Sequence, residues 1–93
     1  MALQDLTFNK EDGKYTCSVQ LSGDVGIHLE YSEKPVRLAI YQSMTGDNYA
    51  PIFATYDSGS IFDRTIVGVL PGMYLKIESE TQPAVAKMLV NEN

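Results

Sequence analysis

The sequence predicts an all-β protein: a single antiparallel β-sandwich, jelly-roll or immunoglobulin-like, of about seven to eight short strands. Two observations carry this prediction. Apolar and polar residues alternate with period two in four separate segments. Residues that favour turns interrupt the chain about every ten residues, which leaves no room for long helices between strands. With 93 residues, the chain has the length of one domain, expected to span residues 1–93.

Four segments alternate clearly, and each is expected to form a strand that buries one face. They cover residues 15–21, 25–31, 36–41 and 73–78. Side chains two residues apart lie on the same face of a strand, so the apolar members of each segment should face the core together. The expected inward residues are Tyr15, Cys17, Val19 and Leu21; Val25, Ile27, Leu29 and Tyr31; Val36, Leu38 and Ile40; and Met73, Leu75 and Ile77.

Weaker patterns predict three further strands. Residues 3–8 are expected to form a strand near the start of the chain. Residues 49–56 are apolar on both faces and contain Pro51, which has no amide hydrogen to donate and therefore indicates an edge strand or a bulge. Residues 61–70 are expected to form one strand that is interrupted by a bulge near Gly68.

Residues 84–90 fit two structures. Val85, Met88 and Leu89 would share a helical face, with Thr81 as a cap and Pro83 in the first turn. A strand fits the regular succession of short strands and turns in the rest of the chain, and we favour it.

The residues between these segments have turn chemistry. Asp12-Gly13 suits a two-residue hairpin loop, because both residues tolerate positive φ. Pro71-Gly72 suits the central positions of a type II turn, in which proline presets φ and glycine takes the left-handed position.

Charge excludes several classes of partner. The chain has 7 Lys and Arg residues against 12 Asp and Glu, for a formal net charge of -5. Binding to nucleic acid or to an anionic membrane surface needs clustered positive charge, and here the cations are scattered. No apolar run approaches the length of about 20 residues that spans a bilayer. The first residues lack the pattern of a signal peptide, so we expect cytoplasmic synthesis.

Few residues have the chemistry of a catalytic or metal site. Cys17 is the only cysteine and alternates with apolar residues, which indicates a buried, unreactive thiol. His28 is the only histidine and shares a solvent face with Glu30. One His and one Cys are too few for a zinc site, so we expect no metal, no cofactor and no catalytic residue. A small enzyme completed around His28 and Glu30 at a subunit interface is the least favoured alternative.

Tyrosine is the one enriched residue type with a functional meaning, with 6 Tyr and no Trp. Tyr41 and Tyr74 fall on outward positions of strands, and Tyr49 and Tyr56 flank the segment that contains Pro51. Tyrosine combines a large apolar ring with a polar tip, which suits protein interfaces and also stabilises sheet surfaces. Small outward alanines nearby favour close approach of another sheet, so these four tyrosines are the interface candidates.

The layout of the chain also resembles small all-β virion proteins of tailed bacteriophages, of the capsid-decoration or fibre-base type. The resemblance covers the succession of strands without helices and the segment 67–77, where the Pro71-Gly72 turn precedes an alternating strand. It implies a structural protein of a virion and no particular site residue. We therefore expect a non-enzymatic module that forms a homo-oligomer or joins a larger protein assembly. The alternative is a carbohydrate-binding module that stacks a glycan on its surface tyrosines.

Overall fold

In the computed structural model, residues 2–33 and 37–91 are described, and their regular structure consists of strands alone. Val36 lies outside the described residues. The strands are β1 (Ala2–Asp5), β2 (Asn9–Glu11), β3 (Lys14–Gln20), β4 (Val25–Glu30), β5 (Leu38–Ser43), β6 (Ala50–Thr55), β7 (Ile61–Ile66), β8 (Tyr74–Ser79) and β9 (Val85–Val90).

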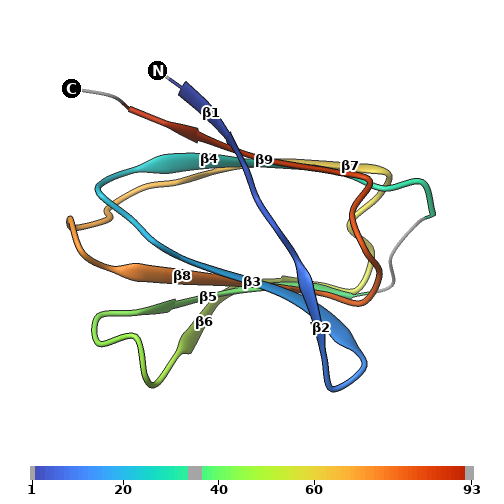
Figure 1. Ribbon diagram of the computed structural model, residues 1–93, viewed down its shortest axis with the longest axis horizontal. Helices are drawn as coiled ribbons and strands as arrows, with labels where there is room; N and C mark the ends of the chain where they lie inside the picture. The colour runs from blue at the N-terminus through green and yellow to red at the C-terminus, as the bar shows by residue number, and fades with distance from the viewer. Residues whose placement is uncertain (1, 34–36, 92–93) are drawn as a thin grey trace.

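The strands form two antiparallel sheets that pack face to face (Figure 1). Sheet A has the order β1-β9-β4-β7, and sheet B has the order β2-β3-β8-β5-β6. The pairs β1 with β9, β3 with β8, β4 with β7, and β5 with β6 are nested inside one another along the chain. This nesting is the topology of a jelly roll, so the predicted sandwich is confirmed and the jelly-roll alternative is the one that forms.

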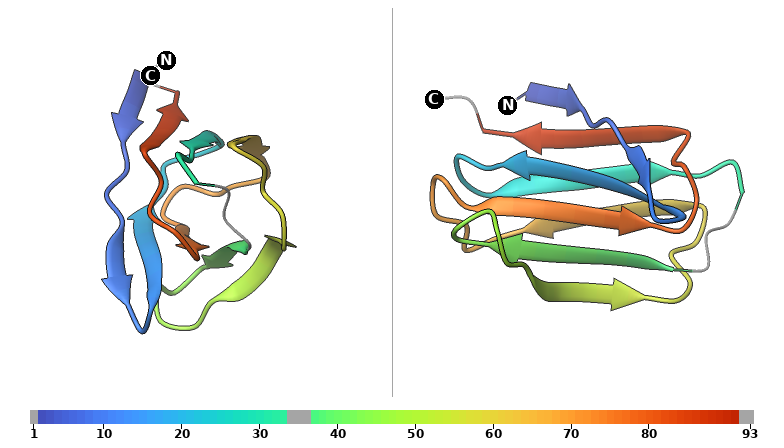
Figure 2. Two further views of the ribbon diagram at one scale, coloured as in Figure 1. Left: turned by 90° about the vertical axis from the view of Figure 1, so that its right-hand side faces the viewer. Right: turned by 60° about the horizontal axis from the view of Figure 1, so that its bottom comes forward.

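The described residues contain nine strands against the seven to eight expected, because the strand predicted over residues 3–8 ends at Asp5 and a further short strand, β2, follows it. β1 pairs with β9 in sheet A, and β2 pairs with β3 in sheet B. Leu6 and Phe8 between them are buried and fasten the crossing segment to the core. In the end-on view of Figure 2, β1 and β2 lie on one side of the sandwich and β6 and β7 on the opposite side.

The core lies between the sheets and is built from the alternating positions. The residues at its centre are only 0% or 1% exposed and include Leu29, Leu38, Ile40, Leu75 and Ile77. The described inward positions predicted from alternation are buried or half-buried. Tyr31, which follows β4, reaches across the core, where its hydroxyl lies 2.9 Å from Ser79 Oγ and satisfies both groups.

Two of the weaker strand predictions are confirmed. β6, which contains Pro51, is the edge strand of sheet B, and its register with β5 shifts between Ile40 and Tyr41, so the proline lies at both an edge and a bulge. Residues 85–90 form a strand, β9, that pairs with β1 on one side and with β4 on the other, so the favoured strand forms and the helical alternative does not.

The predicted strand over residues 61–70 is wrong in its second half. β7 ends at Ile66, and Gly68 has a φ of 75°, which turns the chain out of the sheet instead of forming a bulge within it. Val67 is 73% exposed while Val69 packs against the core, so the apolar residues beyond Ile66 no longer share one face.

Both predicted tight turns form. Asp12 and Gly13 have φ values of 51° and 79°, as a type I′ turn requires, and they join β2 to β3. Gly72 has a φ of 99°, and the Met73 amide donates to the Leu70 carbonyl at 3.1 Å, which closes a turn around Pro71-Gly72. This turn sets the register in which β8 enters sheet B.

Candidate functional site

The outer face of sheet B brings three of the four candidate tyrosines together around one lysine. Tyr41 on β5 is the direct cross-strand partner of Lys76 on β8, and Tyr74 is two residues before Lys76 on the same face. The Lys76 ammonium lies 5.7 Å from the centre of the Tyr49 ring, a cation–π contact. We call Tyr41, Tyr49, Tyr74 and Lys76 the tyrosine cluster.

The loop between β5 and β6 positions two members of this cluster. Gly46 has a φ of 85°, and the Tyr74 ring packs so closely that a Cβ atom at residue 46 would lie 3.0 Å from it. The Ser43 hydroxyl accepts hydrogen bonds from the amides of Thr45 and Gly46, at 3.2 and 2.9 Å, and so holds the start of the loop. The tyrosines are half-buried, which fixes their rings while leaving part of each in contact with solvent.

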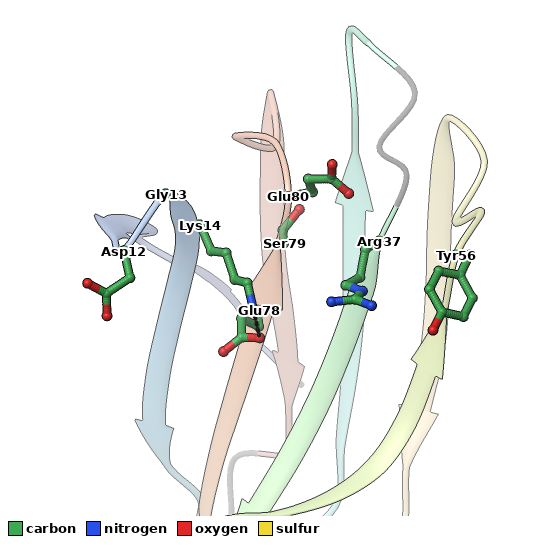
Figure 3. Close-up of a pocket in the computed structure, with 8 residues that line it drawn as sticks. All are labelled: Asp12, Gly13, Lys14, Arg37, Tyr56, Glu78, Ser79 and Glu80. Carbon is green, nitrogen blue, oxygen red and sulfur yellow. Dashed lines mark hydrogen bonds and ion pairs between the residues drawn. The ribbon is translucent and has the colours of Figure 1, made fainter.

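The fourth candidate, Tyr56, lies apart from the cluster, beside a pocket of about 400 Å³. Tyr56 is 71% exposed, and the Arg37 guanidinium lies 5.2 Å from the centre of its ring. Figure 3 shows the residues that line this pocket, which come from the β2–β3 turn, β3, β8 and the chain beside β5 and β6. They are Asp12, Gly13, Lys14, Arg37, Tyr56, Glu78, Ser79 and Glu80.

Glu78 connects the pocket to the tyrosine cluster. Its Oε1 atom accepts a hydrogen bond from the Lys14 ammonium at 3.3 Å and a longer one from the Tyr41 hydroxyl at 3.4 Å. The pocket lining has three carboxylates against two cations, so it does not offer the positive potential that a phosphate group needs. It offers an exposed ring and hydrogen-bonding groups of both kinds.

His28 lies on the opposite face of the molecule, on the outer face of sheet A. Its ring nitrogens contact two carboxylates: Nδ1 lies 2.7 Å from Asp63 Oδ2, and Nε2 lies 2.8 Å from Glu30 Oε2. The hydrogen bonds with Glu30 and then Asp63 raise the pKa of His28 above its ordinary value. The sequence predicts that His28 lies beside Glu30 on one strand face. It does not predict the contact of His28 with Asp63, which is 35 residues away in the chain.

Cys17 is buried in the core, as predicted, and burial raises the pKa of its thiol. It lies on β3 of sheet B, whereas His28 lies on the outer face of sheet A, so the two side chains do not form a nucleophile and base pair. Among residues 2–33 and 37–91, no three His, Cys, Asp or Glu side chains are grouped to hold a metal ion. Within the same part of the chain, no helix has the length and hydropathy of a membrane span.

Comparison of the chain with models of known protein families, with curated proteins and with solved structures finds no match.

Proposed function

We propose that this chain is a non-enzymatic structural or interaction module that self-associates as a component of a virion or a similar assembly. The observation that carries the proposal is the tyrosine cluster, a fixed aromatic surface on one broad face of a small domain. Protein interfaces are enriched in tyrosine, and rigid rings lose little side-chain entropy on contact. Jelly rolls are a frequent architecture of capsid domains, which is support from fold alone.

Two of the four edge strands, β6 and β7, disfavour association by strand pairing. On the edge strand β6, Pro51 lacks an amide hydrogen and the bulge distorts the ladder. On the edge strand β7, Asp63 and Arg64 occupy the centre. In a two-fold antiparallel pair of β7 strands, the central registers would oppose Asp63 to its own copy or Arg64 to its own copy, and like charges repel.

The apolar side chains left in solvent give a second reason to expect association. Leu70, Val67 and Met44, on loops beside sheet edges, are 65%, 73% and 76% exposed. Covering a total of about 1,600 Å² is typical of a specific complex, and the folded chain has 5662 Å² of accessible surface. Burial of these side chains between copies of the chain would stabilise each copy, whose own core is small.

Sedimentation velocity over a range of micromolar concentrations tests this proposal. We expect wild-type protein to form a concentration-dependent oligomer and Tyr74→Ser to weaken it by at least tenfold in dissociation constant. Leu3→Ser, on the outer face of sheet A, is the matched control and should leave the oligomer intact. Circular dichroism of both variants checks that the strands are retained. Equal effects of the two substitutions would exclude the tyrosine cluster as the interface.

The pocket beside Tyr56 favours a second candidate function, a carbohydrate-binding module. Sugars stack on exposed aromatic rings and hydrogen-bond to planar charged groups, and here Tyr56 and Arg37 lie together. A glycan array tests this candidate, with Tyr56→Ala expected to abolish any signal. The carbohydrate-binding function is refuted if the wild-type protein binds no glycan on the array. It is also refuted if binding survives the Tyr56→Ala substitution.

A further inference from the structure

A row of charged side chains crosses all the strands of sheet A on its outer face. Asp5 on β1 is the cross-strand partner of Lys87 on β9, and the two form an ion pair. Lys87 is the partner of His28 on β4, and His28 is the partner of Asp63 on β7. Each strand therefore contributes one charged or titratable side chain, and His28 stands between a cation and a carboxylate.

The two contacts of His28 place a chemical requirement on its protonation. A carboxylate only accepts hydrogen bonds, whereas neutral imidazole has one N–H donor and one nitrogen lone pair. His28 can therefore donate to Asp63 at 2.7 Å and to Glu30 at 2.8 Å at the same time only as the imidazolium. In the neutral ring, one of the two carboxylates would face a lone pair and would be repelled.

The contact with Asp63 joins an edge strand to the rest of the sheet. The amide of Tyr31 donates to the carbonyl of Ser60 at 2.9 Å, which makes that pair hydrogen-bonded and, by alternation, makes His28 and Asp63 a non-hydrogen-bonded pair. No backbone bond links these two residues directly, and their side chains approach closely at such a position. The link between them is therefore made by the side chains.

We propose that His28 is a protonation-dependent clamp: as the imidazolium it binds Glu30 on its own strand and Asp63 on the edge strand β7, and loss of its proton releases Asp63, the more exposed of the two carboxylates. The remaining charges around it are Lys87, which opposes protonation, and Asp5, which neutralises Lys87. Arg64 on β7 lies over the ring of Phe53, 4.3 Å from its centre, and so is engaged with β6.

The sign of the pH dependence follows from the raised pKa of His28. The contribution of the clamp to stability is complete below the ordinary histidine pKa of about 6.5, which describes the unfolded chain. It is lost as the pH rises through the higher pKa of the folded protein. This inference does not depend on self-association, since the clamp lies within one copy of the chain.

Imidazole NMR tests the clamp. We expect ¹⁵N shifts of the His28 ring to show a wild-type pKa above about 6.5 and a lower pKa in both Asp63→Asn and Glu30→Gln. Asp47→Asn is the matched control, because it removes the same charge from the loop between β5 and β6. It should leave the titration unchanged. A wild-type pKa at or below the ordinary value, or an Asp63→Asn variant that titrates like wild type, would overturn the proposal.

Hydrogen exchange gives the structural readout. The amides of Phe62 and Arg64 belong to hydrogen-bonded pairs with β4, so their protection factors report the attachment of the edge strand. In wild type, protection should fall as the pH rises through the His28 titration, and in Asp63→Asn it should be low and free of that step. Protection that shows the same pH profile in both proteins would contradict the clamp.

Discussion

Gly46→Ala should destabilise the protein in two ways: through backbone strain at residue 46 and through crowding of the Tyr74 ring, which belongs to the tyrosine cluster. Gly46 has a φ of 85°, a left-handed conformation that costs an L-residue about 1–2 kcal/mol. A Cβ atom there would lie 3.0 to 3.2 Å from three atoms of the Tyr74 ring, so the ring must also move. Crowding of this kind adds about 1–3 kcal/mol, for a total of about 2–5 kcal/mol.

Gly68→Ala is the matched control, because Gly68 has a φ of 75° and a Cβ atom there would meet no other atom within 4 Å. It should cost only the backbone strain, about 1–2 kcal/mol. Thermal unfolding followed by circular dichroism measures both variants. Since about 1 kcal/mol lowers the midpoint of a domain of this size by about 4–8 °C, the two melting curves should be clearly separated.

A double-mutant cycle completes this test. Tyr74→Ala removes the ring, so Gly46→Ala in that background should cost no more than Gly68→Ala does in wild type. If Gly46→Ala and Gly68→Ala are equally destabilising in wild type, Tyr74 does not pack on the loop as described. The positioning of the tyrosine cluster would then need another cause.

Two further predictions concern the core. Ile77→Ala should lower the free energy of unfolding by about 2–5 kcal/mol, because Ile77 is only 1% exposed, whereas Leu3→Ala, at 66% exposed, should change it by less than about 0.5 kcal/mol. Urea denaturation measures both, and similar midpoints would refute the placement of the core. Cys17 should react with a thiol reagent far more slowly in native protein than in guanidinium, because it is buried and burial raises the pKa of its thiol. Rapid labelling of the folded chain would contradict this.

Much of the fold follows from the sequence because local chemistry and tertiary packing agree. Alternation places Leu29 and Ile77 in the core, and Asp12-Gly13 forms the turn that its φ preferences favour. The pattern misleads beyond Ile66, where the apolar residues continue but Gly68 turns the chain away from the sheet. Periodicity reports which residues share a face only as long as the chain remains extended.

The candidate site was less predictable, because it depends on pairings between distant segments. Alternation indicates that Tyr41 and Tyr74 face outward, but their meeting with Tyr49 depends on the loop that Gly46 bends. In the same way, the contact of His28 with Asp63 requires the nested order of the jelly roll, in which β4 lies beside β7. No local signal in the sequence sets that order.

Self-association through the outer face of sheet B is the central claim, and sedimentation velocity of the wild-type protein beside Tyr74→Ser tests it most directly. From this claim we predict a wild-type oligomer that grows with concentration and a variant that sediments as a monomer at the same concentrations while keeping its strands. A wild-type chain that remains monomeric throughout the micromolar range would contradict it.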